Sequence, residues 1–276
     1  MKRLISALIG LTFALTAVQA LAGAWGQEQG KGLLVNNFTY YQAETFWDKS
    51  GKLRDSGGQF VKREINPYFE YGVYKGWTVS FNGYYHFLTQ TARNSGRQWD
   101  ANGVQDLEFG VQRQIYNEGG FASAVKGTLI VPTGYGLGTI PPLGYDRLGA
   151  QGDLLLGYGW QALNGRNFFV DLQAGYRAYQ DYPSPQVRSL LTFGADLNKI
   201  FQLLVQGEIQ YGLDNQARKQ ADTIALSAYY RLLKQTTQIR VRLDDKHSFA
   251  VGYAWHVWGE NTGTGGGPVA SYWYAF

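Results

Sequence analysis

Pro268-Val-Ala-Ser-Tyr-Trp-Tyr-Ala-Phe276 is the sequence with which the chain ends. Because successive side chains of a strand point to opposite faces, one face of this stretch carries Ala270, Tyr272, Tyr274 and Phe276. Aromatic residues on one face and a terminal Phe are typical of the closing strand of a bacterial outer-membrane β-barrel. An aromatic edge strand of a soluble β-sandwich shows the same alternation, so the rest of the chain has to separate the two classes.

The composition suits many strands joined by tight turns. The 276 residues include 20 Tyr, 15 Phe, 8 Trp and 36 Gly but only 7 Pro and 1 Met. The mean hydropathy of −0.28 is too polar for a bundle of membrane helices. It is compatible with a membrane barrel, because half of each spanning strand faces a polar interior. With no Cys, the chain has no disulfide, thiolate chemistry or zinc–thiolate site.

The first 22 residues predict a signal peptide. Lys2 and Arg3 precede an apolar run, and the small residues Ala20 and Ala22 fit cleavage before Gly23. An anchor helix is the alternative, although the apolar run is short for one. Loss of Lys2 and Arg3 lowers the formal net charge from +4 to +2. A net charge this small, together with the lack of a cluster of basic residues, argues against nucleic acid as a partner. We therefore expect a single barrel domain over 23–276.

Segments of about 9–13 residues that alternate apolar and polar side chains recur through the mature chain, as tilted membrane strands require. The clearest is Trp77–Phe87, with Trp77, Phe81 and Phe87 on one face and Thr78 and His86 on the other. Further strands are predicted at Val61–Tyr71, Gln105–Ile115, Phe121–Val131, Gly152–Trp160, Phe168–Tyr179, Arg188–Leu197, Phe201–Tyr211, Thr237–Leu243 and Ser248–Trp258.

The connections between these segments alternate in length. Short turns are predicted at Gly72–Gly76, Tyr116–Gly120, Gln161–Asn167, Asn198–Ile200 and Asp244–His247. Long loops are predicted at Ala43–Gln59, Gln90–Val104, Pro132–Gln151, Gln180–Val187, Leu213–Gln235 and Gly259–Gly267. This sorting is typical of an outer-membrane barrel with periplasmic turns, and a Greek-key sandwich has no reason for it. The strand number must be even, so we place Thr223–Leu233 in a loop and expect twelve strands, with fourteen still open.

Several short stretches resemble one family, the outer-membrane proteins described as meta-pathway of phenol degradation-like transporters. They are Ala24-Trp25-Gly26-Gln27, Gly30-Lys31-Gly32, Tyr68-Phe69-Glu70-Tyr71-Gly72, Asp106-Leu107-Glu108 and Trp258-Gly259-Glu260-Asn261-Thr262-Gly263. Each is weakly specific, and their order is the stronger signal. The resemblance implies an outer-membrane barrel that passes hydrophobic or aromatic compounds. It brings no catalytic residues.

Side chains of both charges are expected to face the lumen. They are Lys62, Glu64, Glu70, His86, Asp106, Glu108, Lys126, Asp171, Arg177, Arg188, Asp196, Glu208, Arg240 and Arg242. Barrels of about 8 strands are filled by side chains and those of about 16–18 leave an aqueous channel, so twelve lies between. A charge-lined pore and a salt-bridge network that closes the interior both remain open. We expect Arg240 and Arg242 to face the acidic residues of the second and fourth strands.

The sequence supports an enzymatic function less well than a channel function. The three histidines, His86, His247 and His256, lack the spacing of a metal site, and none lies beside an activated nucleophile in the pattern. The glycines of 132–138 form no phosphate cradle. We expect that loop to be exposed, and the alternative is that it folds inward as a constriction or lies over the mouth of the barrel. No cofactor is expected.

The function expected from the sequence is passive uptake of small, aromatic or hydrophobic molecules across the outer membrane. A structural or surface-interaction barrel with a sealed lumen is the alternative, and a lipid hydrolase ranks third. The expected partners are outer-membrane lipid, a small solute, and the barrel-assembly machinery acting through the closing strand that ends in Phe276.

Overall fold

The computed structural model describes residues 23–136, 138, 140–163, 165–213 and 229–276. The predicted signal peptide, 1–22, and most of the predicted loop Leu213–Gln235 lie outside the described residues. Within the described residues, no helix has the length and apolar character to cross a membrane.

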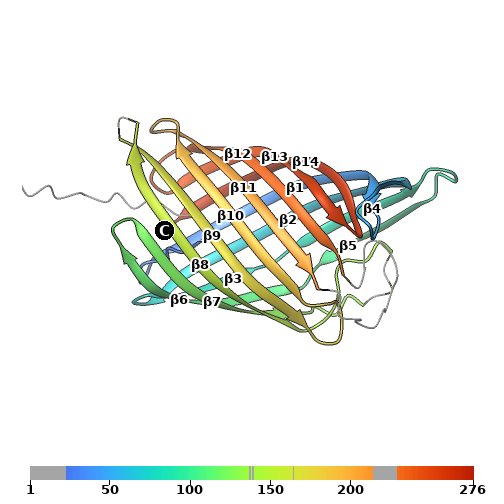
Figure 1. Cartoon of the computed structure of the whole chain (residues 1–276), viewed down its shortest axis with the longest axis horizontal. Coiled ribbons are helices and arrows are strands. Elements are labelled where there is room, and N and C mark those ends of the chain that lie inside the picture. Colours follow the sequence, from blue (N-terminus) through green and yellow to red (C-terminus); the bar gives the residue numbers. More distant parts are fainter. Residues whose placement is uncertain (1–22, 137, 139, 164, 214–228) are drawn as a thin grey trace, which may run out of the picture.

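The described residues form one antiparallel sheet that closes on itself (Figure 1). Its segments are β1 (Gly32–Trp47), β2 (Leu53–Tyr74), β3 (Trp77–Asn82), β4 (Tyr85–Ala92), β5 (Gln98–Val104), β6 (Leu107–Glu118), β7 (Phe121–Val131), β8 (Gly149–Ala162), β9 (Arg166–Tyr179), β10 (Gln186–Asp196), β11 (Phe201–Gly212), β12 (Arg231–Arg242), β13 (His247–Glu260) and β14 (Thr262–Ala275). β3 and β4 both pair with β2 as one interrupted strand, and β5 and β6 pair with them as another. The fourteen segments therefore make twelve strands, and the predicted barrel is confirmed.

The wall closes where β1 pairs with β14 on one side and β2 on the other. The amide of Gly32 donates to the carbonyl oxygen of Phe276 at 2.9 Å, and Phe276 N donates back at 3.0 Å. Both termini of the wall thus lie at the end that carries the connections at 75–76, 119–120, 163–165, 197–200 and 243–246, which we call the turn end. The opposite end, which carries the connections at 48–52, 93–97 and 180–185, is the loop end.

The outer face of the wall is apolar. Phe109, Val111, Leu154, Leu156, Ile209 and Val251 are all exposed, while the residues between them face inward. Polar and charged residues, among them Glu70, Asp171 and Arg177, are buried inside. An apolar exterior around a polar interior is the pattern of a barrel that spans a membrane, and the predicted location in the bacterial outer membrane is confirmed.

Three predicted loops are wrong in length, because the strands continue through them. The connections shrink to Asp48–Lys52 within Ala43–Gln59, Arg93–Arg97 within Gln90–Val104, and Asn261 within Gly259–Gly267. The tenth strand begins at Arg231, inside the predicted loop Leu213–Gln235, instead of at Thr237. These hairpins project beyond the apolar band, where polar side chains suit both faces; for example, Thr89 donates to Asp100 across one of them.

Substitutions on the two faces of β9 test which of its residues face lipid and which face the lumen. Leu172 lies near the middle of β9 and pairs with Leu156 and Leu191 of the flanking strands. Leu172→Arg should lower the free energy of unfolding in lipid vesicles by about 2–4 kcal/mol, the range for a cation at the bilayer midplane. Gln173→Arg, one residue on, should cost much less because Gln173 lines the lumen cavity. Equal losses would show that the faces are wrongly assigned.

Candidate functional site

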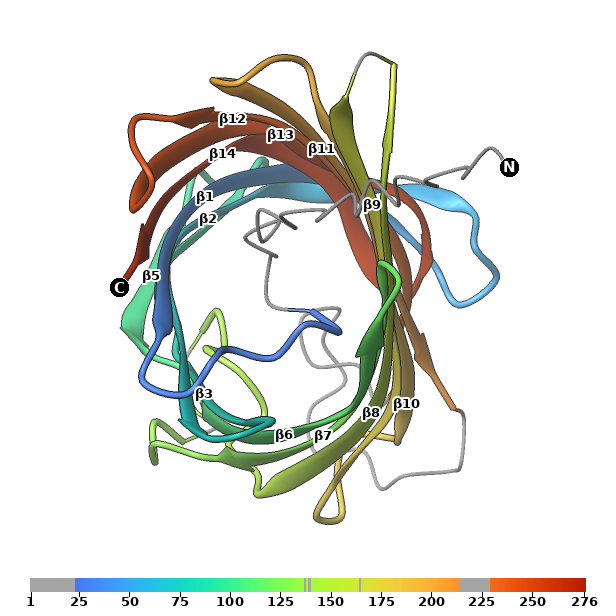
Figure 2. The same ribbon diagram turned by 90° about the vertical axis from the view of Figure 1, so that its left-hand side faces the viewer.

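The segment 23–31 folds back into the lumen at the turn end (Figure 2). Side chains of the wall hold most of its backbone, and one backbone bridge joins it to β2, where Gly30 N donates to the Gly72 carbonyl oxygen and Gly72 N donates to the Lys31 carbonyl oxygen, each at 2.9 Å. Ala24 N donates to Asp171 Oδ2 at 2.7 Å, and Gln27 N donates to Thr78 Oγ1 at 2.9 Å. Gln114 both accepts from Gly26 N and donates to Ala24 O. The inward polar positions of these strands are thus partners of an inserted chain.

Trp25 anchors this segment. Its ring meets Phe169 edge-on at 6.3 Å and packs against the small buried residues Ala122 and Ala124. Gly157 leaves the space that the ring fills, because a Cβ there would lie 2.5 Å from the Trp25 ring. The wall therefore has small residues where the indole is seated.

A second apolar cluster completes the filling of the turn-end half. Leu33, Val35, Phe169, Leu204 and Trp273 are buried together, with Trp25 and Tyr68 against them. The guanidinium of Arg240 lies 4.5 Å from the Trp273 ring centroid, and its Nε donates to Ser248 Oγ at 2.8 Å.

Beyond this filling lies a central cavity of about 340 Å³. Rings of Tyr68, Tyr84 and Trp273 line it, together with the charged residues Glu108, Lys126, Asp153, Arg177, Arg188 and Glu208. Cavities of about 300–1,000 Å³ are typical of small-molecule sites, so the space suits one small ligand.

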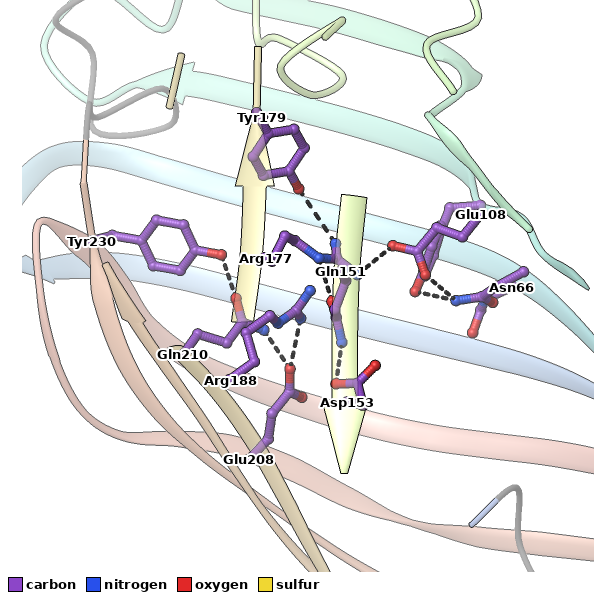
Figure 3. Close-up of polar contacts among 12 residues, drawn as sticks. Asn66, Glu108, Gln151, Asp153, Arg177, Tyr179, Arg188, Glu208, Gln210 and Tyr230 are labelled. Atoms are coloured by element: carbon purple, nitrogen blue, oxygen red, sulfur yellow. Dashed lines mark hydrogen bonds and ion pairs between the residues drawn. The ribbon is translucent and has the colours of Figure 1, made fainter. Parts of the chain in front are cut away.

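Arg177, on β9, links side chains of two other strands around this cavity, β6 and β8 (Figure 3). Its Nη2 lies 2.7 Å from Glu108 Oε1, although β9 and β6 are separated by two strands in the wall. The same guanidinium donates to Gln151, and Gln151 donates to Asp153 at 2.7 Å. One arginine thus gathers acceptors from β6 and β8.

Glu208 forms the second charged group of the cavity. Arg188 Nη2 lies 3.2 Å from its Oε1, and the Lys234 ammonium pairs with its Oε2. Gln210 also donates to it, and Tyr230 donates to Gln210 (Figure 3). Two cations therefore share one carboxylate.

Apart from Lys126, the predicted lumen residues not yet described do not line the central cavity. Glu64 pairs with Lys62 and with His86, each at 2.8 Å. Arg242 pairs with Asp196 at 2.6 Å, so the expectation that Arg240 and Arg242 face the acids of the second and fourth strands is wrong. Further contacts join Glu70 to Gln27 and Tyr68, Lys126 to Tyr68, and Asp106 to Tyr135.

The loop that follows β7 is exposed at Thr133, Ile140 and Leu148 but buried elsewhere, so its expected exposure is wrong for the part around Leu143. Leu143 is buried, and Tyr145 packs its ring on Tyr179 at 5.7 Å. The carboxylate of Asp146 accepts from the amides of Gly134 and Gly136, each at 3.1 Å. Burial raises the pKa of the Tyr145 phenol well above its usual value, so this ring stays neutral.

The histidines each have a structural partner. His247 Nδ1 lies 2.7 Å from Tyr272 Oη, and His256 Nδ1 lies 2.8 Å from the carbonyl oxygen of Gly263. In the turn before His247, amides of Lys246 and His247 donate to Asp244, and these bonds lower the pKa of its carboxyl. The Asp244–His247 stretch is thus a hydrogen-bonded turn.

Sequence reasoning missed the uncharged members of the cavity wall, Tyr68, Tyr84 and Gln151. For two of them the signal was available, because Tyr68 and Tyr84 lie at the same alternate positions as the chosen residues Glu70 and His86. Two charged residues were missed as well, Asp153, which lines the cavity, and Lys234, which pairs with Glu208 and lies in the predicted loop Leu213–Gln235.

No protein-family model and no curated protein matches the sequence. Among solved structures, an outer membrane channel from Pseudomonas putida F1 is similar, with a TM-score of 0.68 at 14% identity over 93% of this chain and 99% of that one. The β domain of a Bordetella autotransporter, BrkA, gives a TM-score of 0.52 at 14% identity over 89% and 99%. These likenesses show a shared fold.

The Arg177–Glu108 pair should contribute measurably to stability. Both side chains are largely shielded, with 9% and 15% exposed. Glu108→Gln leaves the guanidinium without its counter-charge, and should lower the free energy of unfolding by about 1–3 kcal/mol. Arg54→Gln breaks the exposed pair with Asp48, in which Arg54 is 56% exposed, and should cost less than about 1 kcal/mol. Similar losses from both variants would show that the lumen pair adds nothing.

Proposed function

We propose that the protein is an outer-membrane channel for passive uptake of small aromatic or hydrophobic molecules. The observation that carries the proposal is the central cavity, which holds aromatic faces and paired charges between a filled turn-end half and a folded-in loop. The likeness of fold to an outer membrane channel and the resemblance of the short motifs to phenol-pathway transporters both support it.

The cavity suits a solute with a flat apolar body and a polar edge. Tyr68, Tyr84 and Trp273 offer ring faces, while Arg177 and Arg188 with their carboxylates offer donors and acceptors. Because these charges are already paired, a neutral solute does not have to displace a counter-ion. An ion would have to compete with those pairs, so we expect selectivity against ions.

In our proposal the turn end faces the periplasm, as both termini of the wall lie there. Passage along the axis then requires the segment 23–31 to move. It is attached through side-chain hydrogen bonds, the Trp25 ring and two backbone hydrogen bonds with Gly72. Its release would leave every strand of the wall paired.

The alternative is a structural barrel with a sealed lumen. The pairing of Arg177 with Glu108 and of Arg188 and Lys234 with Glu208 favours it, since paired charges close an interior. A structural barrel needs no cavity of ligand size, which is why we favour the channel.

Deletion of residues 24–29 should separate the two functions. We expect small or no ionic conductance from the intact protein in planar bilayers, and discrete conductance steps from the deletion variant, because the turn-end half loses its filling. Lys31→Gln alters the same segment at an exposed position and should behave as the intact protein.

Heat-modifiability on gels shows whether each variant is folded. A folded deletion variant that passes neither ions nor a small solute such as arabinose in liposome swelling would reject the channel and support the sealed barrel.

A further inference from the structure

Arg63 is an exposed cation on the outer face of β2. Its register partners are Tyr40 of β1 and Phe87 of β4, and Phe87 is 43% exposed on the outside of the wall. The residues before and after it, Lys62 and Glu64, pair with each other on the lumen side. Among the described residues, no side chain forms an ion pair or a hydrogen bond with the Arg63 side chain. Its guanidinium is therefore free to bind a group from outside the protein.

Two other arginines on the outer face of the wall already have partners. Arg113 donates to the carbonyl oxygen of Lys75 at 2.8 Å, and Arg231 pairs with Glu260 at 2.8 Å. An unpaired cation on the outside of a membrane barrel is tolerated near the headgroups and is costly in the hydrocarbon. Arg63 thus has to lie at a depth where an external counter-charge is available.

The residues around Arg63 place it at the loop-end edge of the apolar band. On its turn-end side, the outward residues Ile65 and Phe38 are apolar and exposed. Farther toward the loop end the outer face is polar, and Gln59 donates to Glu44 at 3.1 Å. In the orientation of our proposed function the loop end faces outward, so Arg63 lies at the headgroup level of the outer leaflet.

The outer face is hollowed beside Arg63. The groove has a volume of about 410 Å³, within the usual range for small-molecule sites, and its lining includes Tyr40, Gln42, Glu44, Tyr253, Gly266 and Pro268. Strands β13, β14, β1 and β2 lie side by side in that order, so the groove spans the first three and Arg63 lies on the fourth (Figure 1). Since facing side chains of neighbouring strands are about 5 Å apart, the guanidinium can reach the rim of the groove at Tyr40.

The groove offers ring faces together with polar groups. The Tyr40 hydroxyl donates to Gln42 Oε1 at 2.8 Å, and Gln42 Nε2 donates to Glu44 Oε1 at 3.4 Å, so these polar groups are held in a chain of hydrogen bonds. On the opposite side the ring of Tyr253 is half exposed. Aromatic faces pack against the C–H groups of a sugar ring, and amides and carboxylates bond to its hydroxyls. Arginine matches the geometry of a phosphate.

We propose that this groove and Arg63 bind the headgroup of a phosphorylated glycolipid of the outer leaflet, with a phosphate on Arg63 and a sugar ring between Tyr40 and Tyr253. Glu44 lies four residues farther along β1 than Tyr40, so its carboxylate accepts sugar hydroxyls away from the phosphate. The acyl chains lie along the apolar band, where Val251 is exposed. The proposal uses the orientation of the proposed function, but the site lies outside the lumen and does not depend on transport.

The test is a titration of the full barrel in detergent with bis-phosphorylated lipid A, in which native mass spectrometry measures the bound fraction. Arg63→Gln should weaken binding by about tenfold or more, because it removes the charged donor to the phosphate. Arg63→Lys should keep part of the affinity, since an ammonium pairs with phosphate as a point charge. Tyr253→Ala should weaken binding by removing a ring face. Arg113→Gln removes an outward arginine at the turn end and should bind as the unaltered protein does.

Two further lipids distinguish the parts of the headgroup that are recognised. Lipid A without phosphates and phosphatidylglycerol should each bind more weakly than bis-phosphorylated lipid A, because the first lacks the anion and the second lacks the sugar. Phosphatidylglycerol that binds as tightly as lipid A would overturn the glycolipid assignment. Equal losses from Arg63→Gln and Arg113→Gln, or no binding of lipid A, would overturn the site altogether. Heat-modifiability on gels shows that each variant is folded.

The 24–29 deletion variant separates this result from the channel function. Arg63→Gln added to that variant should leave its conductance steps unchanged, since Arg63 lies outside the lumen. Conductance without Arg63-dependent binding of lipid A rejects the glycolipid site and keeps the channel. Arg63-dependent binding without conductance keeps the site and rejects the channel.

Discussion

The structure depends on one requirement: each backbone N–H and C=O inside a membrane must find a partner within the protein. A sheet meets it only by closing, and here the reciprocal bonds between Gly32 and Phe276 complete the closure at the turn end. Closure fixes the outward and inward positions of every strand, and so separates the apolar band of Val111 and Val251 from the polar lumen. The inserted segment meets the same requirement mainly with side-chain partners, and with the backbone of Gly72 where it joins β1.

The space inside the closed barrel has to be filled as well. Twelve strands enclose more space than their inward side chains occupy, and the chain fills the turn-end half with its own first residues. The Trp25 ring packs against Gly157, which has no side chain, and against the ring of Phe169. The other half keeps a cavity in which charges are tolerated because they are paired, as Arg177 is with Glu108.

The sequence predicts the faces well and the ends of strands poorly. Alternation is a local property, so the opposite orientations of Glu108 and Phe109 follow from their neighbours alone. The apolar band also ends where the membrane ends, and the polar hairpins beyond it were taken for loops. Arg231–Gln235 was assigned to a loop for another reason, the requirement for an even number of strands, although β11 needs it as a partner.

What the sequence determined by itself is the class of wall: antiparallel strands of membrane length, an even number of them, and the side on which each residue lies. Period-two patterning and turn spacing carry that information within a few residues. Only the tertiary structure decided which lumen residues meet. Arg177 reaches Glu108 and Arg242 reaches Asp196 because strand tilt and barrel curvature bring together positions that no spacing in the chain relates. The entry of 23–31 into the lumen was likewise decided there, because the space it fills exists only once the barrel has closed.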